Sequence, residues 1–123
     1  MVGSDGIYNP GDVACHPRAF GTFPRYLGHY IRDRKILSRE EGIRRITGMP
    51  AQRYGLKRKG MIKIGYDADL VLFDYDRIRD HADFMDPFKP NEGIHMVFMQ
   101  GECVLKDNEP TGKWVGKYIK SEK

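Results

Sequence analysis

An acidic residue close to the N-terminus is the first candidate for chemistry in this sequence. The chain opens MVGSDG, in which residues 1–3 are typical of the end of a buried strand and Asp5 follows where that strand stops. Barrels built from alternating strands and helices place their catalytic groups at this end of their strands, so Asp5 is a candidate catalytic residue. The alternative is that residues 4–6, Ser-Asp-Gly, form only a turn or a helix cap, because these residue types dominate turns.

A local zinc site is the second chemistry to consider. Cys15, His16 and His29 are the ligand-type residues that follow Asp5. His16 and His29 are 13 residues apart, across a loop and a predicted helix, and no closely spaced His or Cys pair anchors them. We therefore interpret His16 as a loop residue and His29 as a helix residue beside arginines, not as zinc ligands.

The composition excludes several classes of protein. The chain has 123 residues, which fits one domain with a modest core, and its 31% charged and 40% apolar residues favour a soluble globular protein over a disordered one. No apolar run approaches membrane-spanning length, and no signal-peptide pattern is present. Cys15 and Cys103 lie far apart, so we expect two free thiols in a reducing cytoplasm.

The net charge of +4 and the pI of about 9.1 raise nucleic-acid binding as a further class. The densest basic stretch, LKRKGMIK at residues 56–63, ends in a predicted turn and strand. A solvated turn explains this stretch better than a nucleic-acid patch does. We therefore expect neither a nucleic-acid partner nor a membrane partner.

Helical patterns dominate the first half of the chain. After a long loop without periodicity, residues 22–37 (TFPRYLGHYIRDRKIL) predict a helix with Thr22 as its N-cap and Pro24 in its first turn. An apolar stripe with helical spacing runs along it, through Phe23, Leu27, Tyr30 and Ile31. Gly28 inside this helix predicts close packing against a neighbouring segment.

Two shorter helices follow. Residues 37–48 (LSREEGIRRITG) contain a capping box, in which Ser38 caps the Glu41 amide and the Glu41 side chain reaches back to Ser38, with Gly48 as the end of the helix. Residues 49–56 predict a third helical turn that stops at Gly55.

The second half changes to strand patterns. We predict a short strand at residues 61–64 and a central strand at residues 70–73, because both faces of the latter are apolar. Residues 77–93 are polar, with two prolines, and predict a loop. Residues 94–105 predict a β-hairpin with Gln100-Gly101 as its two-residue turn.

These motifs together resemble the C-terminal part of the amidohydrolase superfamily and, more narrowly, the D-aminoacylase (N-acyl-D-amino-acid deacylase) family. The resemblance runs in order over essentially the whole chain. The segment KGMIKIGYDADLVLFD is shared by many amidohydrolases and does not select a substrate. The block HPRAFGTFPRYLGHY is narrower and indicates the D-aminoacylases. The remaining matching segments are GSDG, LSREEGIRRITGMPAQRYGL and the hairpin VFMQGECVLKD.

The resemblance implies an α+β fold. The chain would be a fragment of a (β/α)8 amidohydrolase barrel, comprising the end of the last strand and its helices, followed by the C-terminal part of a small β-sandwich. Residues 1–58 would belong to the barrel and residues 59–123 to the sandwich. Asp5 would then be a metal ligand and the general base and acid of amide hydrolysis. Arg18 would either bind the substrate carboxylate bidentately or bond loop carbonyls, and Arg25 is expected to be structural.

The resemblance also defines a function and its alternative. The parent would be a zinc-dependent hydrolase that cleaves N-acyl-D-amino acids to a carboxylate and a free D-amino acid. The other zinc ligands of the family belong upstream of Asp5, so the chain alone is expected to be inactive and to bind no zinc tightly. The alternative is a catalytically inactive tail that acts as a structural or assembly module. Exposed apolar faces, at Phe23/Leu27/Ile31 and Leu70/Leu72, predict that the isolated chain is a homo-oligomer.

Overall fold

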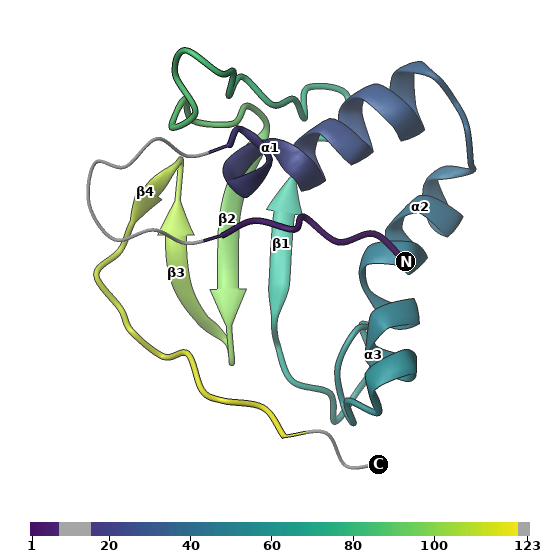
Figure 1. The fold of residues 1–123 in the computed structure, drawn as a ribbon. Coiled ribbons are helices and arrows are strands. Elements are labelled where there is room, and N and C mark those ends of the chain that lie inside the picture. The colour runs from purple at the N-terminus through teal and green to yellow at the C-terminus, as the bar shows by residue number, and fades with distance from the viewer. Residues whose placement is uncertain (8–15, 121–123) are drawn as a thin grey trace.

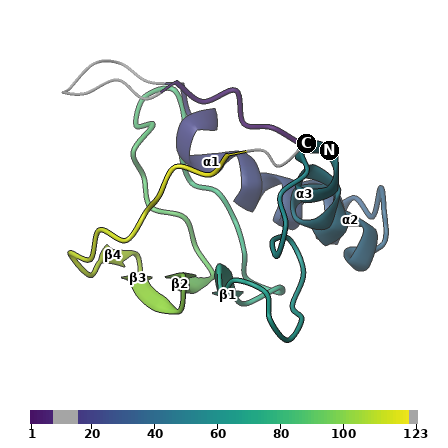
Figure 2. The same cartoon turned by 90° about the horizontal axis from the view of Figure 1, so that it is seen from below.

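The chain folds into a helical layer and a small antiparallel sheet (Figure 1). The computed structural model describes residues 1–7 and 16–120. In the view of Figure 2 the helices lie on one side of the sheet, whose strands are seen end-on. None of the helices in the described part of the chain has the length and the apolar content to cross a bilayer. The elements in chain order are α1 (Arg18–Arg25), the π-helix η1 (Tyr26–Asp33), α2 (Arg39–Ile46), α3 (Gly48–Tyr54), β1 (Leu70–Phe73), β2 (Ile94–Met99), β3 (Glu102–Lys106) and β4 (Glu109–Pro110).

The first helix begins four residues before the predicted N-cap. The carbonyl of Pro17 accepts from the amides of Phe20 and Gly21, at 3.2 and 2.9 Å, so the helical turns start there. Thr22 therefore lies inside α1, and its hydroxyl donates to the Arg18 carbonyl at 2.7 Å. The predicted cap was wrong because a threonine hydroxyl can also bond to the carbonyl four residues back within a helix.

The proline of α1 lies in the helix interior and not in its first turn. Pro24 has no N–H, so the carbonyl of Phe20 loses its helical donor. The side chain of Asn91 takes that place, because its Nδ2 donates to the Phe20 carbonyl at 3.0 Å. The break in the helical ladder is thus filled by a residue 71 positions away.

The glycine inside the helix has the packing role that its position predicts. A Cβ added to Gly28 in η1 would lie 2.2 Å from the backbone oxygen of Ile78. No side chain fits there, so η1 and the segment through Ile78 pack backbone against backbone. The guanidinium of Arg32 spans the same junction and donates to the carbonyls of Tyr75, Asp76 and Ile78 at 2.9–3.1 Å.

The predicted ends of the next helices are confirmed in part. Ser38 caps α2, accepting from the Glu41 amide at 3.2 Å. The carboxylate of Glu41, however, contacts the guanidinium groups of Arg44 and Arg45, at 2.7 and 2.9 Å. Gly48 begins α3 instead of ending α2, while Gly55 ends α3 in the left-handed conformation with φ 66°.

The sheet is a meander in the order β1-β2-β3-β4, with every neighbouring pair antiparallel. The predicted central strand is therefore wrong, since β1 is an edge strand, and its Val71 and Leu72 are 54% and 53% exposed. Residues 61–64 form no strand, and Ile62 and Ile64 are fully exposed. Apolar residues on both faces indicate a covered strand only where the covering segments are present in the same chain.

The predicted hairpin is confirmed. β2 and β3 are joined by Gln100 and Gly101, with φ values of 52° and 84°, as a type I′ turn requires. Residues 67–69 (DAD), just before β1, stabilise this turn. Asp69 accepts from the Gln100 amide at 2.8 Å, and the Ala68 carbonyl accepts from the Gly101 amide. A hydrogen bond from Lys59 lowers the pKa of Asp69.

The buried core lies between the helices and the segment after β1. Tyr26, Leu27, Ile31 and Ile78 form it, each at most 8% exposed. Of the predicted apolar stripe, Leu27 and Ile31 are buried, whereas Phe23 and Tyr30 are each 41% exposed. The core therefore joins residues on both sides of the predicted domain boundary at residues 58 and 59, which remains a prediction.

Candidate functional site

Asp5 lies in a turn of the N-terminal stretch. Its φ of 50° is in the left-handed region, and the Ser4 hydroxyl accepts from the Gly6 amide at 3.2 Å, which closes the turn locally. The stretch is tied to the helical layer where the Val2 amide donates to the Arg45 carbonyl at 3.4 Å. The Asp5 carboxylate itself is 84% exposed. The turn is therefore made by the neighbours of Asp5, which leaves its carboxylate open for chemistry.

The structure brings Asp5 and Arg18 together. Their side chains form an ion pair of 3.2 Å between Nη1 of Arg18 and Oδ2 of Asp5. Arg18 is the first residue of α1, and its backbone amide donates to Nδ1 of His16 at 3.1 Å. The Nε of Arg18 is buried and has no hydrogen-bond partner among the described residues. The guanidinium therefore keeps a donor unused while it contacts the candidate catalytic acid.

This ion pair is one that a ligand can open. Exposed pairs of this kind contribute only about 0–1 kcal/mol to stability, because water solvates both charges well. Arg18 is 39% exposed and Asp5 84% exposed, so both side chains remain in contact with water, although Nε of Arg18 is buried. Another carboxylate can therefore compete with Asp5 for this guanidinium.

The described residues do not make a complete metal site. They contain no group of three or more His, Cys, Asp or Glu side chains placed to hold a metal ion. A carboxylate such as that of Asp5 fits zinc as one oxygen ligand, but zinc usually takes three or four protein ligands. Cys15 lies outside the described residues, whereas Cys103 is a free thiol on β3. Among the described residues, Asp5 thus offers a single oxygen ligand and no complete zinc site.

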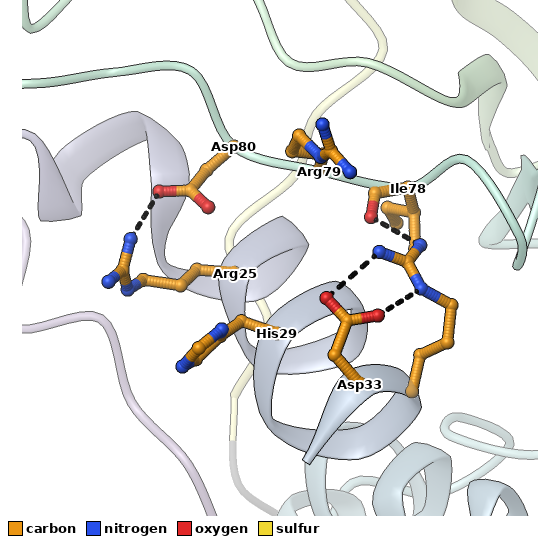
Figure 3. Close-up of a pocket in the computed structure, with 7 residues that line it drawn as sticks. Arg25, His29, Asp33, Ile78, Arg79 and Asp80 are labelled. Carbon is orange, nitrogen blue, oxygen red and sulfur yellow. Dashed lines mark hydrogen bonds and ion pairs between the residues drawn. The ribbon is translucent and has the colours of Figure 1, made fainter. Parts of the chain in front are cut away.

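A polar pocket of about 270 Å³, separate from Asp5 and Arg18, lies between the helix pair α1–η1 and residues 78–80 (Figure 3). Its charges largely satisfy one another: Arg25 pairs with Asp80 at 3.2 Å, and Arg32 with Asp33 at 2.7 Å. The hydrogen bond with Asp80 raises the pKa of Arg25, and that with Arg32 lowers the pKa of Asp33. Arg25 thus has the structural contact expected of it.

The sequence patterns missed two residues that contact the neighbours of Arg18, His16 and Phe20. The ring of Phe84 meets His16 edge-to-face at 4.9 Å, and that of Phe88 meets Phe20 at 5.3 Å. Both phenylalanines belong to the loop predicted at residues 77–93, which has no periodicity that would mark contact residues. Two aromatic residues in an otherwise polar loop were the only available signal.

Comparison with known proteins identifies the family of this chain. A model of the amidohydrolase family matches residues 1–105. The chain is 42% identical to a D-aminoacylase of Alcaligenes xylosoxydans xylosoxydans over 119 residues, which is 97% of this chain and 24% of that protein. It superposes on the crystal structure of a D-aminoacylase that defines a novel subset of amidohydrolases, with a TM-score of 0.86 and 43% identity, over 92% of this chain and 23% of that one.

A second solved structure adds a ligand to the comparison. It is an N-acyl-D-glutamate deacylase from Bordetella bronchiseptica in complex with zinc and a phosphonate inhibitor that mimics the tetrahedral intermediate. The TM-score is 0.82 and the identity 37%, over 89% of this chain and 23% of that one. The chain therefore spans about a quarter of the length of the relatives it matches.

Proposed function

This chain belongs to the amidohydrolase family, and from that premise we propose that it is the C-terminal part of a zinc-dependent hydrolase of N-acyl-D-amino acids. The reaction cleaves the amide bond and yields a carboxylate and a free D-amino acid. The similarity to a D-aminoacylase and to an N-acyl-D-glutamate deacylase supports this substrate class.

The ion pair between Asp5 and Arg18 is the observation that carries the proposal. An N-acyl-D-amino acid presents two features to an enzyme, the amide bond to be cleaved and a free carboxylate beside it. A guanidinium binds a carboxylate through two parallel hydrogen bonds, and an aspartate transfers protons. Arg18 and Asp5 place one group of each kind 3.2 Å apart, on the segment that matches these enzymes.

Each residue then has a defined task. Arg18 turns its guanidinium from Asp5 to the substrate carboxylate, which orients the amide bond relative to Asp5. The freed Asp5 carboxylate accepts a proton from the attacking water and passes it to the leaving amine nitrogen. Zinc, bound by Asp5 together with ligands outside this chain, would supply the lowered pKa of that water.

The rest of the chain would serve as the scaffold of this site. Residues 1–58 would form the end of the (β/α)8 barrel with its last strand and outer helices. Residues 59–123 would form the C-terminal share of a β-sandwich, of which the four-stranded sheet is the visible part. The exposed edge strand β1 would then pair with a segment outside this chain.

The alternative is that the chain serves as an inactive structural or assembly module. The incomplete set of metal ligands in the described residues favours it for the chain taken alone. Both roles are compatible, since a segment that completes a larger enzyme has no turnover by itself.

A chimera tests the proposal. This chain would replace the matching quarter of the D-aminoacylase of Alcaligenes xylosoxydans xylosoxydans, and turnover of N-acetyl-D-methionine and zinc content would be measured. We expect an active chimera, and we expect Asp5→Asn to lower kcat by about 10²–10⁴-fold, which is typical for loss of a general base. The 123-residue chain assayed alone should show neither turnover nor stoichiometric zinc.

The matched control is Asp107→Asn. Asp107 is also an exposed aspartate with a left-handed backbone, φ 49°, but it lies in the turn after β3. Its replacement should leave kcat unchanged. A folded, zinc-loaded chimera without turnover, or normal kcat in the Asp5→Asn variant, would contradict the proposed function.

A further inference from the structure

The loop between β1 and β2 is closed by backbone hydrogen bonds between its two ends. Residues 79–92 begin and end at a backbone bridge, in which the Arg79 amide donates to Glu92 at 3.1 Å and the Glu92 amide donates back at 2.9 Å. A surface loop of this length with its ends together is an Ω-loop, a class that is often functional. The side chains of Arg77 and Glu92 strengthen the closure with an ion pair of 2.9 Å. We refer to residues 79–92 as the Ω-loop.

The interior of the Ω-loop is braced by one carboxylate. Asp83 accepts from the amides of Met85 and Asp86, both at 2.8 Å, and from Nζ of Lys89 at 2.6 Å. The hydrogen bond from Lys89 and those from the two amides lower the pKa of Asp83. The loop therefore holds its own shape and can position what it touches.

Three side chains of the Ω-loop contact the segment that carries Arg18. Phe84 packs edge-to-face on His16 with ring centroids 4.9 Å apart, and Phe88 packs on Phe20 at 5.3 Å. Asn91 donates to the Phe20 carbonyl at 3.0 Å, the carbonyl that Pro24 leaves without a helical donor. In both views the loop lies beside the N-terminal end of α1 (Figures 1 and 2).

The residues contacted in this way stand on either side of Arg18. His16 lies two positions before it and Phe20 two positions after it, and Nδ1 of His16 also accepts from the Arg18 amide at 3.1 Å. The first turn of α1 is therefore held at both ends by the Ω-loop. The direction of the guanidinium depends on that turn, because Arg18 is its first residue.

We propose that the Ω-loop positions Arg18 for substrate binding, with Phe84, Phe88 and Asn91 as positioning residues that act through His16 and Phe20. The inference rests on the proposed function, in which Arg18 binds the substrate carboxylate. An edge-to-face aromatic pair adds a favourable energy beyond its buried area, and so does a neutral hydrogen bond. Such energies are small for folding, but a misplacement of about 1 Å at a substrate-binding group can lower the rate by about 10²-fold.

A double-mutant cycle in the active chimera tests this inference. We expect Phe88→Ala to raise KM for N-acetyl-D-methionine by about tenfold with a smaller decrease in kcat, because binding by Arg18 is weakened and the amide bond is less well oriented, while Asp5 itself is untouched. Phe88→Tyr keeps the ring and should restore KM. Met85→Ala is the matched control, since Met85 is in the same loop but 94% exposed.

The cycle separates the two proposals. Arg18→Ala should itself raise KM by about 10–100-fold, as expected for loss of hydrogen bonds to a charged group, and in that background Phe88→Ala should have no further effect. If Arg18→Ala leaves KM unchanged, the role of Arg18 in the proposed function fails. If Arg18→Ala raises KM but Phe88→Ala has no effect, adds to it fully, or lowers kcat alone, the positioning role of the Ω-loop fails.

Hydrogen exchange provides a readout that does not depend on activity. In the folded chimera, Asn91→Ala and Phe88→Leu, which are milder changes, should speed exchange at the amides of Ala19, Phe20 and Gly21 by about tenfold. These amides donate to the His16 and Pro17 carbonyls in the first turn of α1. Unchanged exchange in both variants would overturn the inference even if the Phe88→Ala variant failed to fold.

Discussion

The helical layer and the sheet edge contain similar apolar residues, which are buried in the first region and exposed in the second. In the helical layer, Ile31 and Ile78 are each 2% exposed, because η1 and the segment after β1 cover one another. At the sheet edge, Val71 and Leu72 are more than half exposed, and Ile64 in the preceding segment is fully exposed. Ile31 and Ile78 cover each other from positions 47 residues apart, whereas Val71 and Leu72 stay more than half exposed although they pair with β2.

The difference shows how to recognise the part of a fold that is completed from outside. An apolar strand pattern indicates that other segments cover both faces of the strand, but it does not indicate whether those segments belong to the same chain. Large exposed apolar patches on soluble proteins mark interaction sites. β1 and residues 61–64 therefore form the surface where we expect a further segment.

The largest effect should come from truncating one isoleucine in each region. Ile31→Ala removes a fully buried side chain and should lower the free energy of unfolding by about 2–5 kcal/mol. Ile64→Ala, at a fully exposed position, should change it by less than about 0.5 kcal/mol. Urea unfolding of the 123-residue chain measures both.

Ile31→Val keeps the comparison measurable if the alanine variant does not fold, with an expected loss of about 0.5–1.5 kcal/mol. Equal effects at positions 31 and 64 would mean that Ile64 is covered in the folded chain as fully as Ile31 is.

Association of the isolated chain should come next in size. We propose that the chain is a homo-oligomer in solution, because β1 offers unpaired backbone groups and exposed apolar side chains. The helical face is a weaker contributor than the sequence predicted, since Leu27 and Ile31 are buried and only Phe23 of that set is exposed. A lysine on an edge strand opposes pairing, so Val71→Lys should yield a monomer of 14.2 kDa.

Sedimentation equilibrium at micromolar concentration measures this association. Ile7→Lys is the control, because Ile7 is 67% exposed but lies away from the sheet in sequence, in the N-terminal stretch. A monomeric wild-type chain, or equal dissociation by both lysines, would contradict the proposal.

The smallest effect concerns the pH dependence of the helical layer. Hydrogen bonds from Arg44 and then Arg45 lower the pKa of Glu41 from 4.5 to about 2. Because the pKa is lowered on folding, the carboxylate stabilises the chain fully above pH 4.5, and this contribution is lost as the pH falls toward 2. Wild type should therefore be more stable than Glu41→Gln at pH 7, with the difference vanishing near pH 2.

Thermal unfolding between pH 7 and pH 2 measures that difference. In a background with both Arg44 and Arg45 replaced by glutamine, Glu41→Gln should have no pH-dependent effect. A difference between wild type and Glu41→Gln that does not change with pH would exclude the ion pairs as its source.

Local signals in the sequence predicted the elements that depend on neighbouring residues. The Gln100-Gly101 turn, the Ser38 cap and the Gly55 stop each follow from residues within one or two turns of chain, and all three are confirmed. The predicted start of α1 was wrong because Pro17 and Thr22 both fit local rules for the start of a helix. The longer helix is possible because Asn91 supplies a donor to the Phe20 carbonyl. No local rule contains a partner 71 residues away.

The residues of the candidate site were predicted from the family resemblance, whereas their contacts depend on the tertiary structure. The position of Asp5 after a strand-like stretch nominates it only weakly, because Ser-Asp-Gly is equally typical of turns. Neither the pairing with Arg18 nor the contacts of Phe84 and Phe88 follow from any periodicity. The contacts of Phe84 and Phe88 arise because the Ω-loop returns to the start of α1 from about 70 positions further along the chain, which requires the fold itself.

The hydrogen bond from Asn91 to Phe20 also sets an order of events during synthesis. A ribosome adds about 5–20 residues per second, so the first helix emerges roughly 4–14 s before the residue that completes its ladder. During that interval the Phe20 carbonyl depends on water, and α1 has only its own turns to hold it. The segment that carries Arg18 therefore acquires its final shape only once residue 91 has emerged, just before β2 can pair with β1 and start the sheet.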